Sequence, residues 1–280
     1  MNAAAEKAGM KLKRALSDGR FCLQSLDLAE ALERRRYRKE HAVALPIPPR
    51  RLRALVGPDP RIESFLALGQ RTAGDIRNAL AAVGRELESF ANILDFGCGC
   101  GRQMRWFANL PRSCRLYGSD VCVPAIRWNR RCLPFAEFKL NGFYPPLPYP
   151  AETFDLVYAL SVFTHLDESN QSAWVEELRR VASPGALVII TVQGEVGLAG
   201  FRDGSLPASA EFLERLNRHA QLGQEGLIFE PYERGSKYGL AFHDDSYIRE
   251  HWGRKLRILK FIPRGGDGWQ DVVVLEKEKR

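Results

Sequence analysis

Between residues 91 and 192, short apolar runs alternate with longer segments whose apolar residues recur at helical spacing. This alternation favours a parallel sheet with helices on both faces, because each parallel connection must cross back over the sheet. The run GALVIITV is apolar throughout, as expected for a strand buried on both faces. We expect strands at 91–96, 115–120, 136–141, 153–160 and 185–192, and helices at 101–110, 123–133 and 168–182.

The C-terminal third has a different pattern. Two strand-like runs after residue 254 are joined across Gly265 to Gly268, which predicts a hairpin and hence an antiparallel pair at the end of the sheet. Helices are predicted at 207–222 and 244–253. The fold class is therefore α/β: a Rossmann-like, doubly wound sheet of seven strands, mostly parallel, with a C-terminal antiparallel hairpin.

The N-terminal part is predicted to be helical at 5–42 and again at 62–83. The stretch LPIPPRR, residues 45–51, separates the two helices because proline lacks an N–H and restricts the residue before it. We therefore expect an N-terminal helical extension or cap over residues 1–84. The main domain would follow over residues 85–280, with segment 194–243 inserted as a cap.

The net charge of +7 comes from the N-terminal arm. Residues 1–53 hold 13 Lys and Arg against 6 Asp and Glu, whereas the remaining residues hold 28 of each sign. The run ERRRYRK, residues 33–39, is compatible with an anionic partner such as nucleic acid or a membrane surface, and equally with a solvated basic helix face. No apolar run reaches the roughly 18 residues of a membrane span. The absence of a signal pattern and the six cysteines predict a cytoplasmic protein with reduced thiols.

The stretch ANILDFGCGCGR, residues 91–102, is the most informative motif. Gly97, Gly99 and Gly101 follow an expected strand, where missing side chains allow a sharp turn and close approach to a ligand. A helix opening at residue 101 would add the positive end of its dipole. The dinucleotide fingerprint G-x-G-x-x-G requires glycine where this chain has Arg102, which disfavours a nicotinamide enzyme.

Cys98 and Cys100 sit between these glycines. A metal site would need further ligands at suitable spacing, and the sequence has no second cysteine pair and no histidine pattern that supplies them. We therefore predict no metal site. Two acids flank the loop: Asp95 precedes the first glycine, and Asp120 ends the next strand, where it could bind ribose hydroxyls.

The ordered motifs resemble those of class I S-adenosylmethionine-dependent methyltransferases. LDFGCGCGR resembles the first motif of that family and YGSDV, residues 117–121, resembles the second. Residues 138–166 are similar to the adenine-contact segment and fourth strand, and RVASPGALVIITV, residues 180–192, to the approach to the fifth strand. The segment 229–252 is similar to a bacterial subset associated with glycan or secondary-metabolite methylation.

The resemblance implies S-adenosyl-L-methionine as the cofactor and a role for each matching residue. Asp95 would reach the methionine amine, and the three glycines would admit the amino-acid and ribose parts. Asp120 would accept bonds from both ribose hydroxyls, beside Val121. This chain has Asn141-Gly142 where many members have an acid for the adenine. The implied cofactor-binding residues are Asp95, Gly97, Gly99, Gly101, Asp120, Val121, Asn141, Gly142, Leu160 and Ser161, the last two facing the sulfonium.

The implied reaction is in-line methyl transfer, in which a hydroxyl acceptor needs a general base. His165, just past the fourth strand, and His243, in the segment that resembles the acceptor side, are the candidate catalytic residues. Each could instead have a structural role. The motifs typical of nucleic-acid base methylation are missing, because ALSVFTHL stands where Asn/Asp-Pro-Pro-aromatic is usual.

The sequence thus favours O-methylation of a small molecule, sugar or glycan hydroxyl. Alternatives are N-methylation of a small amine, an RNA or protein methyltransferase that uses the basic arm, and a non-catalytic cofactor-binding partner subunit. The expected partner is a small-molecule or glycan acceptor, with nucleic acid disfavoured, no membrane span, and a homodimer left open.

Overall fold

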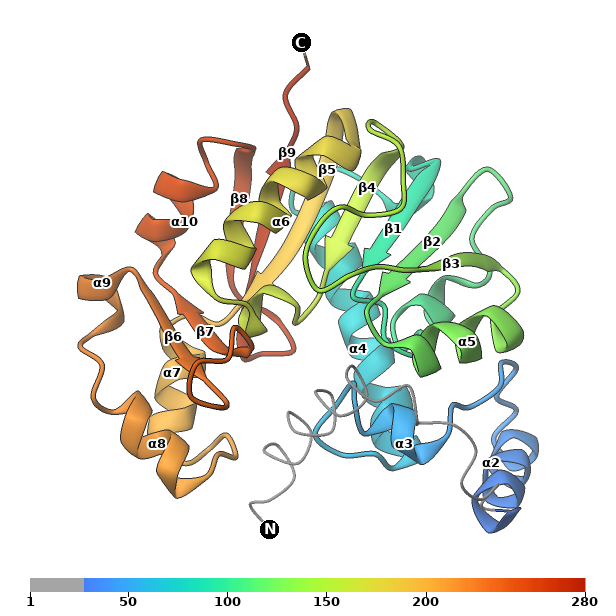
Figure 1. The fold of residues 1–280 in the computed structure, drawn as a ribbon. Helices are drawn as coiled ribbons and strands as arrows, with labels where there is room; N and C mark the ends of the chain where they lie inside the picture. Colours follow the sequence, from blue (N-terminus) through green and yellow to red (C-terminus); the bar gives the residue numbers. More distant parts are fainter. Residues whose placement is uncertain (1–27, 280) are drawn as a thin grey trace.

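The computed structural model describes residues 28–279 and has a seven-stranded sheet at its centre (Figure 1). The strand order is β3-β2-β1-β4-β5-β9-β8. The expected seven-stranded sheet with a terminal hairpin is confirmed. Its strands are β1 (Asn92–Phe96), β2 (Arg115–Asp120), β3 (Ala136–Leu140), β4 (Phe154–Ala159), β5 (Ala182–Val192), β8 (Arg257–Gly266) and β9 (Gln270–Glu276).

Strands β3, β2, β1, β4 and β5 are parallel, and β9 pairs antiparallel with both β5 and β8. In this register Asp95 of β1 lies opposite Gly118 of β2 and Tyr158 of β4. The carboxyl ends of β1, β2 and β4 therefore share one edge of the sheet, which is the lower edge in Figure 1. In open α/β sheets this edge is where ligands bind.

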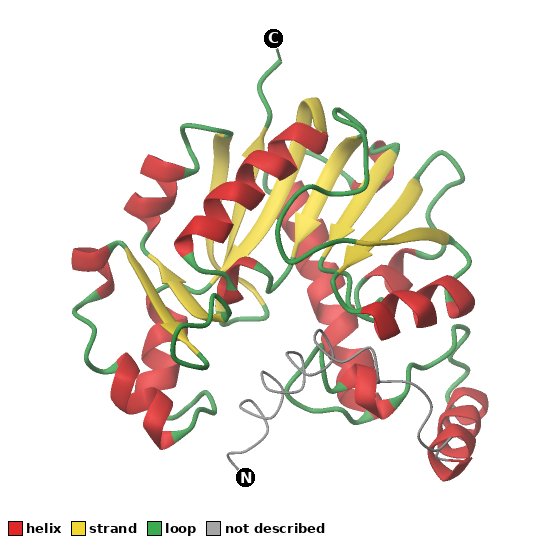
Figure 2. Ribbon diagram, viewed as in Figure 1, coloured by secondary structure: helices red, strands yellow, loops and turns green. Residues whose placement is uncertain are grey.

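Helices cover both faces of the sheet (Figure 2). One face packs on α6 and α10, with Trp174 and Trp252 among the buried side chains. The other face packs on α4 and α5. The helices are α2 (Leu28–Glu40), α3 (Arg50–Arg53), α4 (Ile62–Ala81), α5 (Val123–Cys132), α6 (Glu168–Val181), α7 (Glu195–Arg202), α8 (Ala210–Leu216), α9 (Leu222–Glu225) and α10 (Asp245–His251), and the short 3₁₀ turns are η1 (Leu87–Ser89), η2 (Met104–Phe107) and η3 (Phe163–His165).

Helix α4 belongs to the same core as the sheet. Its buried residues Ile76 and Leu80 lie in one apolar cluster with Ile93 of β1, Ile189 of β5 and Val274 of β9. A domain boundary at residue 84 would cut through this cluster. We therefore propose that the sheet domain begins before α4 and that the N-terminal extension is shorter than residues 1–84. The part of the expected 5–42 helix before residue 28 lies outside the described residues.

The expected helix over 101–110 is wrong. Residues 104–107 form only the 3₁₀ turn η2, with Trp106 N bonded to Gln103 O at 3.0 Å. Tertiary contacts override the local helical pattern here, because Arg102 and Arg105 turn inward to backbone carbonyls of the N-terminal segment. The glycine loop therefore runs into a short turn, and no long helix aims its N-terminus at a ligand.

The inserted segment contains more structure than the sequence indicated. The predicted helix 207–222 is two short helices, α8 and α9, and α7 precedes them. Strands β6 (Leu227–Pro231) and β7 (Gly239–His243) form an antiparallel hairpin that was not predicted. The segment has its own small apolar core, built around Phe212, Leu216 and Phe242. Figure 1 shows the hairpin and α7–α8 on one side of the lower sheet edge, with α3 on the other side.

Candidate functional site

The glycine loop is built from left-handed backbone. Gly97, Gly99 and Gly101 have φ values of +80°, +51° and +73°, in a backbone region that residues other than glycine rarely adopt. A Cβ atom at any of the three would clash with a packed side chain: Val162 at Gly97, Val56 at Gly99 and Leu133 at Gly101. The three glycines are thus required both by backbone conformation and by close packing.

Asp120 at the end of β2 is held by backbone amides. Its Oδ2 accepts a hydrogen bond from Gly99 N at 2.8 Å, and its Oδ1 accepts one from Cys122 N at 2.7 Å. These bonds fix the carboxylate beside the glycine loop and leave each oxygen a second lone pair for a ligand hydroxyl. Burial raises the pKa of Asp120, and the amide bonds oppose that rise.

Asp95 at the end of β1 is a buried acid with an unused acceptor. Its side chain is 2% exposed, and Oδ2 has no hydrogen-bond partner among residues 28–279. Burial raises its pKa to about 8, the Tyr158 hydroxyl opposes that rise, and the negative charge of Asp120 adds to it. A buried carboxyl oxygen without a donor is costly, and a ligand ammonium group would supply one. The residue therefore fits the predicted contact to a methionine amine.

Asn141 and Gly142 follow β3 at the same edge. The backbone N–H of Asn141 donates to the backbone carbonyl of Asp120 at 3.1 Å, so the residues predicted to contact adenine and ribose are neighbours. The Asn141 Oδ1 is buried and has no partner in the described part of the chain. An exocyclic amine is a suitable donor for such an oxygen. Val121, which follows Asp120, is half-buried.

Leu160 and Ser161 follow β4, where the cofactor sulfur was predicted to lie. Ser161 has φ +56°, a left-handed conformation that costs energy for a residue with a side chain. Its N–H donates to Thr191 Oγ1 at 2.7 Å, and Gln270 Nε2 donates to its Oγ at 2.9 Å. Bonds from β5 and β9 thus hold this turn. Gln270 was not predicted from the sequence, because this residue lies 109 residues from Ser161 and belongs to no motif.

His165 lies in a cluster of rings beyond the end of β4. Its Nδ1 is 2.9 Å from Gly239 O and 3.0 Å from the Tyr232 hydroxyl, and its ring centroid is 5.3 Å from that of Tyr238. A carbonyl oxygen can only accept, so Nδ1 carries the proton and the second nitrogen, Nε2, holds the lone pair. Nε2 has no hydrogen-bond partner within the described chain. Burial lowers the pKa of His165, which keeps the ring neutral.

Tyr238 connects this ring cluster with the cofactor side. Its centroid is 5.5 Å from that of Tyr232 and 6.5 Å from that of Phe143, just after Asn141-Gly142. Burial raises the pKa of the Tyr238 hydroxyl, and the charge of Asp120 contributes to the rise. The structure therefore brings His165 together with Tyr232 and Gly239, which lie 67 and 74 residues away along the chain, and with Tyr238 beside Gly239.

His243 is in a different environment and does not join this cluster. It is 1% exposed on β7, and its Nε2 lies 2.7 Å from Gln171 Oε1. The Gln171 amide nitrogen donates to backbone carbonyls, so Gln171 Oε1 is the acceptor and His243 donates from Nε2. The ring packs on Trp252, and burial lowers its pKa to about 3. Its Nδ1 is buried and has no hydrogen-bond partner in the described part of the chain. This enclosed position favours a structural role for His243, and we therefore propose His165 as the base.

The cysteines of the loop are packed side chains. Cys98 lies in the sheet core and Cys100 in a small cluster with Leu52 and Cys122. Burial raises the thiol pKa of both, which keeps them protonated and poor metal ligands. No group of three or more His, Cys, Asp or Glu residues suited to a metal is found between residues 28 and 279.

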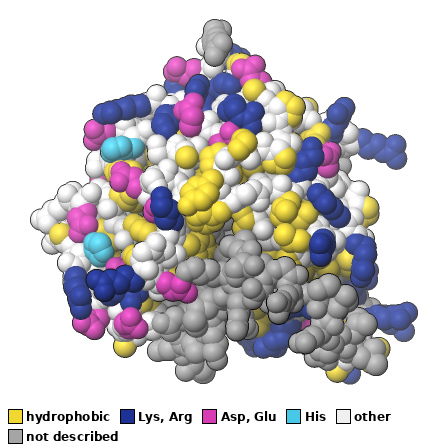
Figure 3. All heavy atoms as spheres, in the orientation of Figure 1, with side chains coloured by type: hydrophobic (Ala, Val, Ile, Leu, Met, Phe, Trp, Pro, Cys, Tyr) yellow, Lys and Arg dark blue, Asp and Glu magenta, His cyan; other side chains and the backbone are white. Residues whose placement is uncertain are grey.

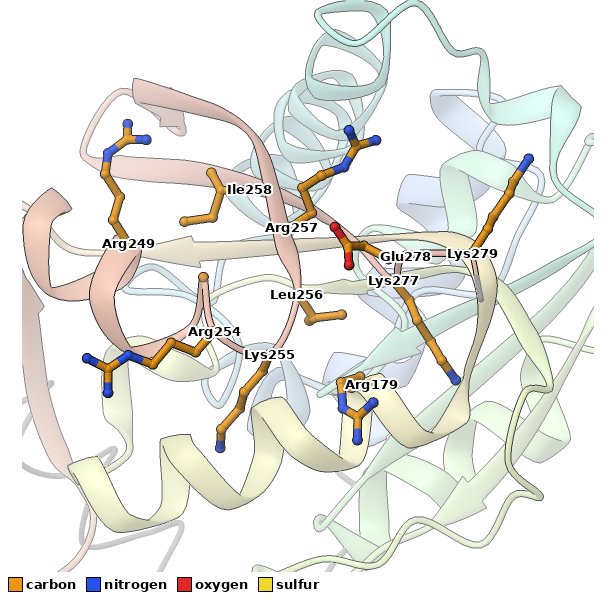
Figure 4. A pocket seen from close by; sticks show the side chains of 11 residues that line it. Arg179, Arg249, Arg254, Lys255, Leu256, Arg257, Ile258, Lys277, Glu278 and Lys279 are labelled. Carbon is orange, nitrogen blue, oxygen red and sulfur yellow. The ribbon is translucent and has the colours of Figure 1, made fainter.

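A cavity of about 560 Å³ lies elsewhere, at the end of α6 and the start of β8 (Figure 4). It is lined by several cations, including Arg179, Arg254 and Lys277, and by none of the predicted site residues. Neighbouring acids neutralise most of this charge, as in the Arg179–Glu176 and Arg254–Glu250 pairs.

On the face seen in Figure 3, apolar side chains gather towards the middle and Lys and Arg lie mainly around the margin.

Residues 94–190 match a family model described as a methyltransferase domain. A tRNA (carboxymethyluridine(34)-5-O)-methyltransferase of Arabidopsis thaliana is 34% identical over 141 residues, covering 48% of this chain and 32% of the relative. A probable chloroplastic tocopherol O-methyltransferase of Oryza sativa subsp. japonica is 30% identical over 146 residues, covering 49% of this chain and 39% of the relative. The chain thus spans less than half the length of these curated relatives.

Among solved structures, a magnesium protoporphyrin IX methyltransferase of Synechocystis PCC 6803, described with bound SAH, matches with a TM-score of 0.54. The two chains are 16% identical, and the match covers 89% of this chain and 99% of that one, which shows a shared fold. No helix within residues 28–279 is long and apolar enough to cross a membrane. The family match, the strand order and the glycine loop together show that residues 94–190 are part of a methyltransferase domain, and they support the class I S-adenosylmethionine-dependent type.

Proposed function

We propose that this protein transfers a methyl group from S-adenosylmethionine to a hydroxyl oxygen of a small molecule, sugar or glycan. The observation that carries the proposal is the state of His165, whose Nδ1–H is held by Gly239 O and whose Nε2 is left as a proton acceptor. An oxygen acceptor needs such a base, whereas an uncharged amine has a free lone pair.

The bound cofactor supplies a methyl group that is already activated on a sulfonium. In our proposal, Asp95 binds its ammonium group and Asp120 accepts hydrogen bonds from both ribose hydroxyls. Asn141 and Gly142 contact the adenine, and Val121 lies beside it. Gly97, Gly99 and Gly101 let the backbone approach, while Leu160 and Ser161 face the sulfur. The buried oxygens Asp95 Oδ2 and Asn141 Oδ1 support this arrangement, because neither has a hydrogen-bond donor among residues 28–279.

His165 moves the proton. Its Nε2 would take the hydroxyl proton of the acceptor as the oxygen accepts the methyl group that the bound cofactor would supply. The resulting imidazolium is stabilised by Gly239 O on Nδ1–H. Tyr232 sits at 3.0 Å from the same nitrogen and orients the ring. Alignment of oxygen, carbon and sulfur supplies much of the rate, on the order of 7–11 kcal/mol for well-oriented groups.

The acceptor is proposed to lie against the half-buried rings of Tyr232, Tyr238 and Phe143. Aromatic faces pack against apolar rings and sugar C–H groups, and the tyrosine hydroxyls can bond polar substituents. The relatives from Arabidopsis and rice are both named as O-methyltransferases, which supports an oxygen acceptor, whereas one from Actinopolyspora halophila is named as an N-methyltransferase.

The first experiment is calorimetric titration with S-adenosylmethionine, S-adenosylhomocysteine and NAD. We expect micromolar binding of the two sulfur ligands and none of NAD. A panel of hydroxyl and amine acceptors, assayed with methyl-labelled cofactor, then tests the oxygen preference. Binding of NAD alone would overturn the cofactor assignment, and transfer only to amines would overturn the hydroxyl assignment.

A tRNA acceptor is the second candidate. The Arabidopsis relative is named for methylating a tRNA nucleoside, and α2 is rich in arginine. Under this alternative, methyl transfer to tRNA would fall steeply with salt because phosphate contacts release counterions. Transfer to bulk tRNA, lost on neutralising Arg35 and Arg36 in α2, would favour it over the small-molecule proposal.

A further inference from the structure

The proline-rich stretch that separates the N-terminal helices packs directly against the glycine loop. We call residues 45–57 the proline strap. Pro46, Pro48 and Pro49 lack an N–H, so this segment cannot pair as an ordinary strand. Its carbonyl groups still need donors where they are buried. The strap therefore depends on side chains from elsewhere to satisfy its backbone.

Buried arginines supply these donors. Arg105 Nη2 donates to the carbonyls of Leu45 and Pro46, both at 3.2 Å, and Arg102 Nη1 donates to Val56 O. Arg102 and Arg105 are 8% and 7% exposed. Arg102 follows Gly101 directly and Arg105 lies in η2, so the two ends of the strap are bonded to the segment that follows the glycine loop.

The strap lies against the backbone that holds Asp120. Its residue Leu52 shares a buried cluster with Cys100 of the loop and with Cys122 before α5. Val56 occupies the space that a Cβ of Gly99 would fill. Since Gly99 and Cys122 donate the two amide bonds to Asp120, the strap borders the proposed ribose site and shields those bonds from water.

Arg102 makes no ion pair with a carboxylate within the described residues, and burial lowers its pKa. Burying a guanidinium without a close carboxylate is costly, so a contribution to stability alone is a poor explanation of its position. What the residue achieves is geometric, because its bond to Val56 O sets the Val56 side chain against Gly99.

We propose that Arg102 is a positioning residue that couples the proline strap to cofactor binding. By holding Val56 on Gly99 it fixes the loop in its binding shape, and a bound cofactor in turn holds the strap closed. The inference rests on the proposed function, because it takes S-adenosylmethionine as the ligand of the glycine loop.

The test measures S-adenosylhomocysteine affinity by calorimetry in Arg102→Ala, Arg102→Lys and Val56→Ala. Loss of a charged hydrogen bond predicts that Arg102→Ala raises Kd at least about tenfold. The Kd of Arg102→Lys should lie between the values for Arg102→Ala and the wild type. Val56→Ala should raise Kd about threefold, because it removes two methyl groups that pack against the loop. In acceptor assays the same variants should raise the KM for S-adenosylmethionine and leave kcat within about twofold.

A second readout is limited trypsin cleavage after the exposed residues Arg50 and Arg51 of the strap, followed by mass spectrometry. We expect S-adenosylhomocysteine to slow this cleavage in the wild type and to give little protection in Arg102→Ala. Arg202→Ala is the matched control, because it removes guanidinium bonds to the carbonyls of His219 and Ala220, away from the loop. Its Kd should equal that of the wild type.

Two outcomes separate the inference from the function. If the wild type binds S-adenosylhomocysteine and both Arg102→Ala and Val56→Ala bind it equally well, the coupling is wrong while the proposed function stands. If the wild type fails to bind, the proposed function is wrong and the inference falls with it. Should Arg102→Ala not fold, Val56→Ala decides the question, because its side chain is only half-buried.

Discussion

The cofactor side and the acceptor side of this molecule are built in different ways. On the cofactor side, Gly97 to Asp120 form the site through backbone conformation and amide bonds within one β-turn-β unit. On the acceptor side, His165 meets Tyr232 and Gly239, which arrive on a separate hairpin. The cofactor side is formed by residues close together in the chain, so it can be recognised as a sequence motif. The acceptor side depends on long-range packing, so its residues are scattered along the sequence and form no motif.

The largest effect is expected from a substitution in the glycine loop. Gly97→Val should abolish cofactor binding and lower the free energy of unfolding by about 3 kcal/mol, because left-handed strain adds to a clash with Val162. Calorimetry and thermal unfolding measure the two effects. Gly84→Ala is the control: Gly84 has φ +70° and nothing within 4 Å of its would-be Cβ, so only strain is added. Equal losses in both variants would mean that strain alone, without crowding at the loop, is responsible.

The next largest effect is a difference in turnover between variants of His165 and His243. His165→Ala should lower kcat about 10²-fold or more, as removal of a general base does, with cofactor affinity nearly unchanged. His243→Gln should keep turnover near the wild-type value, because His243 is enclosed by Gln171 and Trp252. Steady-state kinetics on a shared acceptor compares the pair. The reverse order of effects would restore His243 as the base.

The pH profile sharpens the assignment of His165. Burial lowers its pKa below the ordinary value of 6.5, and the base must be unprotonated. Turnover should therefore be constant near neutrality and fall only at pH values below about 6.5. An acid limb centred above 6.5 would contradict a desolvated base at this position.

Asp120→Asn should weaken cofactor binding about tenfold. The amide can keep one acceptor for Gly99 or Cys122 but presents an NH₂ group to the other amide, which disturbs both the loop and the ribose contact. Calorimetry with S-adenosylhomocysteine gives the change. Asp155→Asn is a control, because Asp155 also accepts hydrogen bonds from two backbone amides, those of Ala91 and Asn92 at the start of β1. Comparable weakening in the control would argue against a ribose role for Asp120.

The last prediction concerns stability in acid, an effect that is absent at neutral pH. His243 has a pKa of about 3 in the folded protein and about 6.5 when unfolded, so the unfolded chain binds the extra proton between these values. Folding stability should decrease as pH falls from 6.5 towards 3, and stay constant above 6.5 as far as this residue is concerned. Denaturant titrations of wild type and His243→Gln should show a shallower pH dependence for the variant. Identical slopes would show that His243 is not the group responsible.

Much of the fold could be predicted from the sequence, because its signals are local. Apolar runs of five to eleven residues separated by helical patterns specify a parallel sheet, and the Gly-rich turn after Ile93 to Phe96 marks its ligand edge. Asp95 and Asp120 were predicted at strand ends for the same reason. The helix expected after the loop was wrong because Arg102 and Arg105 have partners 46 and 59 or 60 residues away, which no window of local sequence contains.

The sheet, the glycine loop and the acids at its edge could be read from the sequence, since backbone conformation and strand periodicity are properties of neighbouring residues. The different surroundings of His165 and His243 appear only in the folded structure. Each has one ring nitrogen without a partner in the described chain, but the His165 ring is half-buried, whereas His243 is 1% exposed and bonded to Gln171. The tertiary structure also placed the proline strap on Gly99, because packing depends on which surfaces meet and not on their separation along the chain.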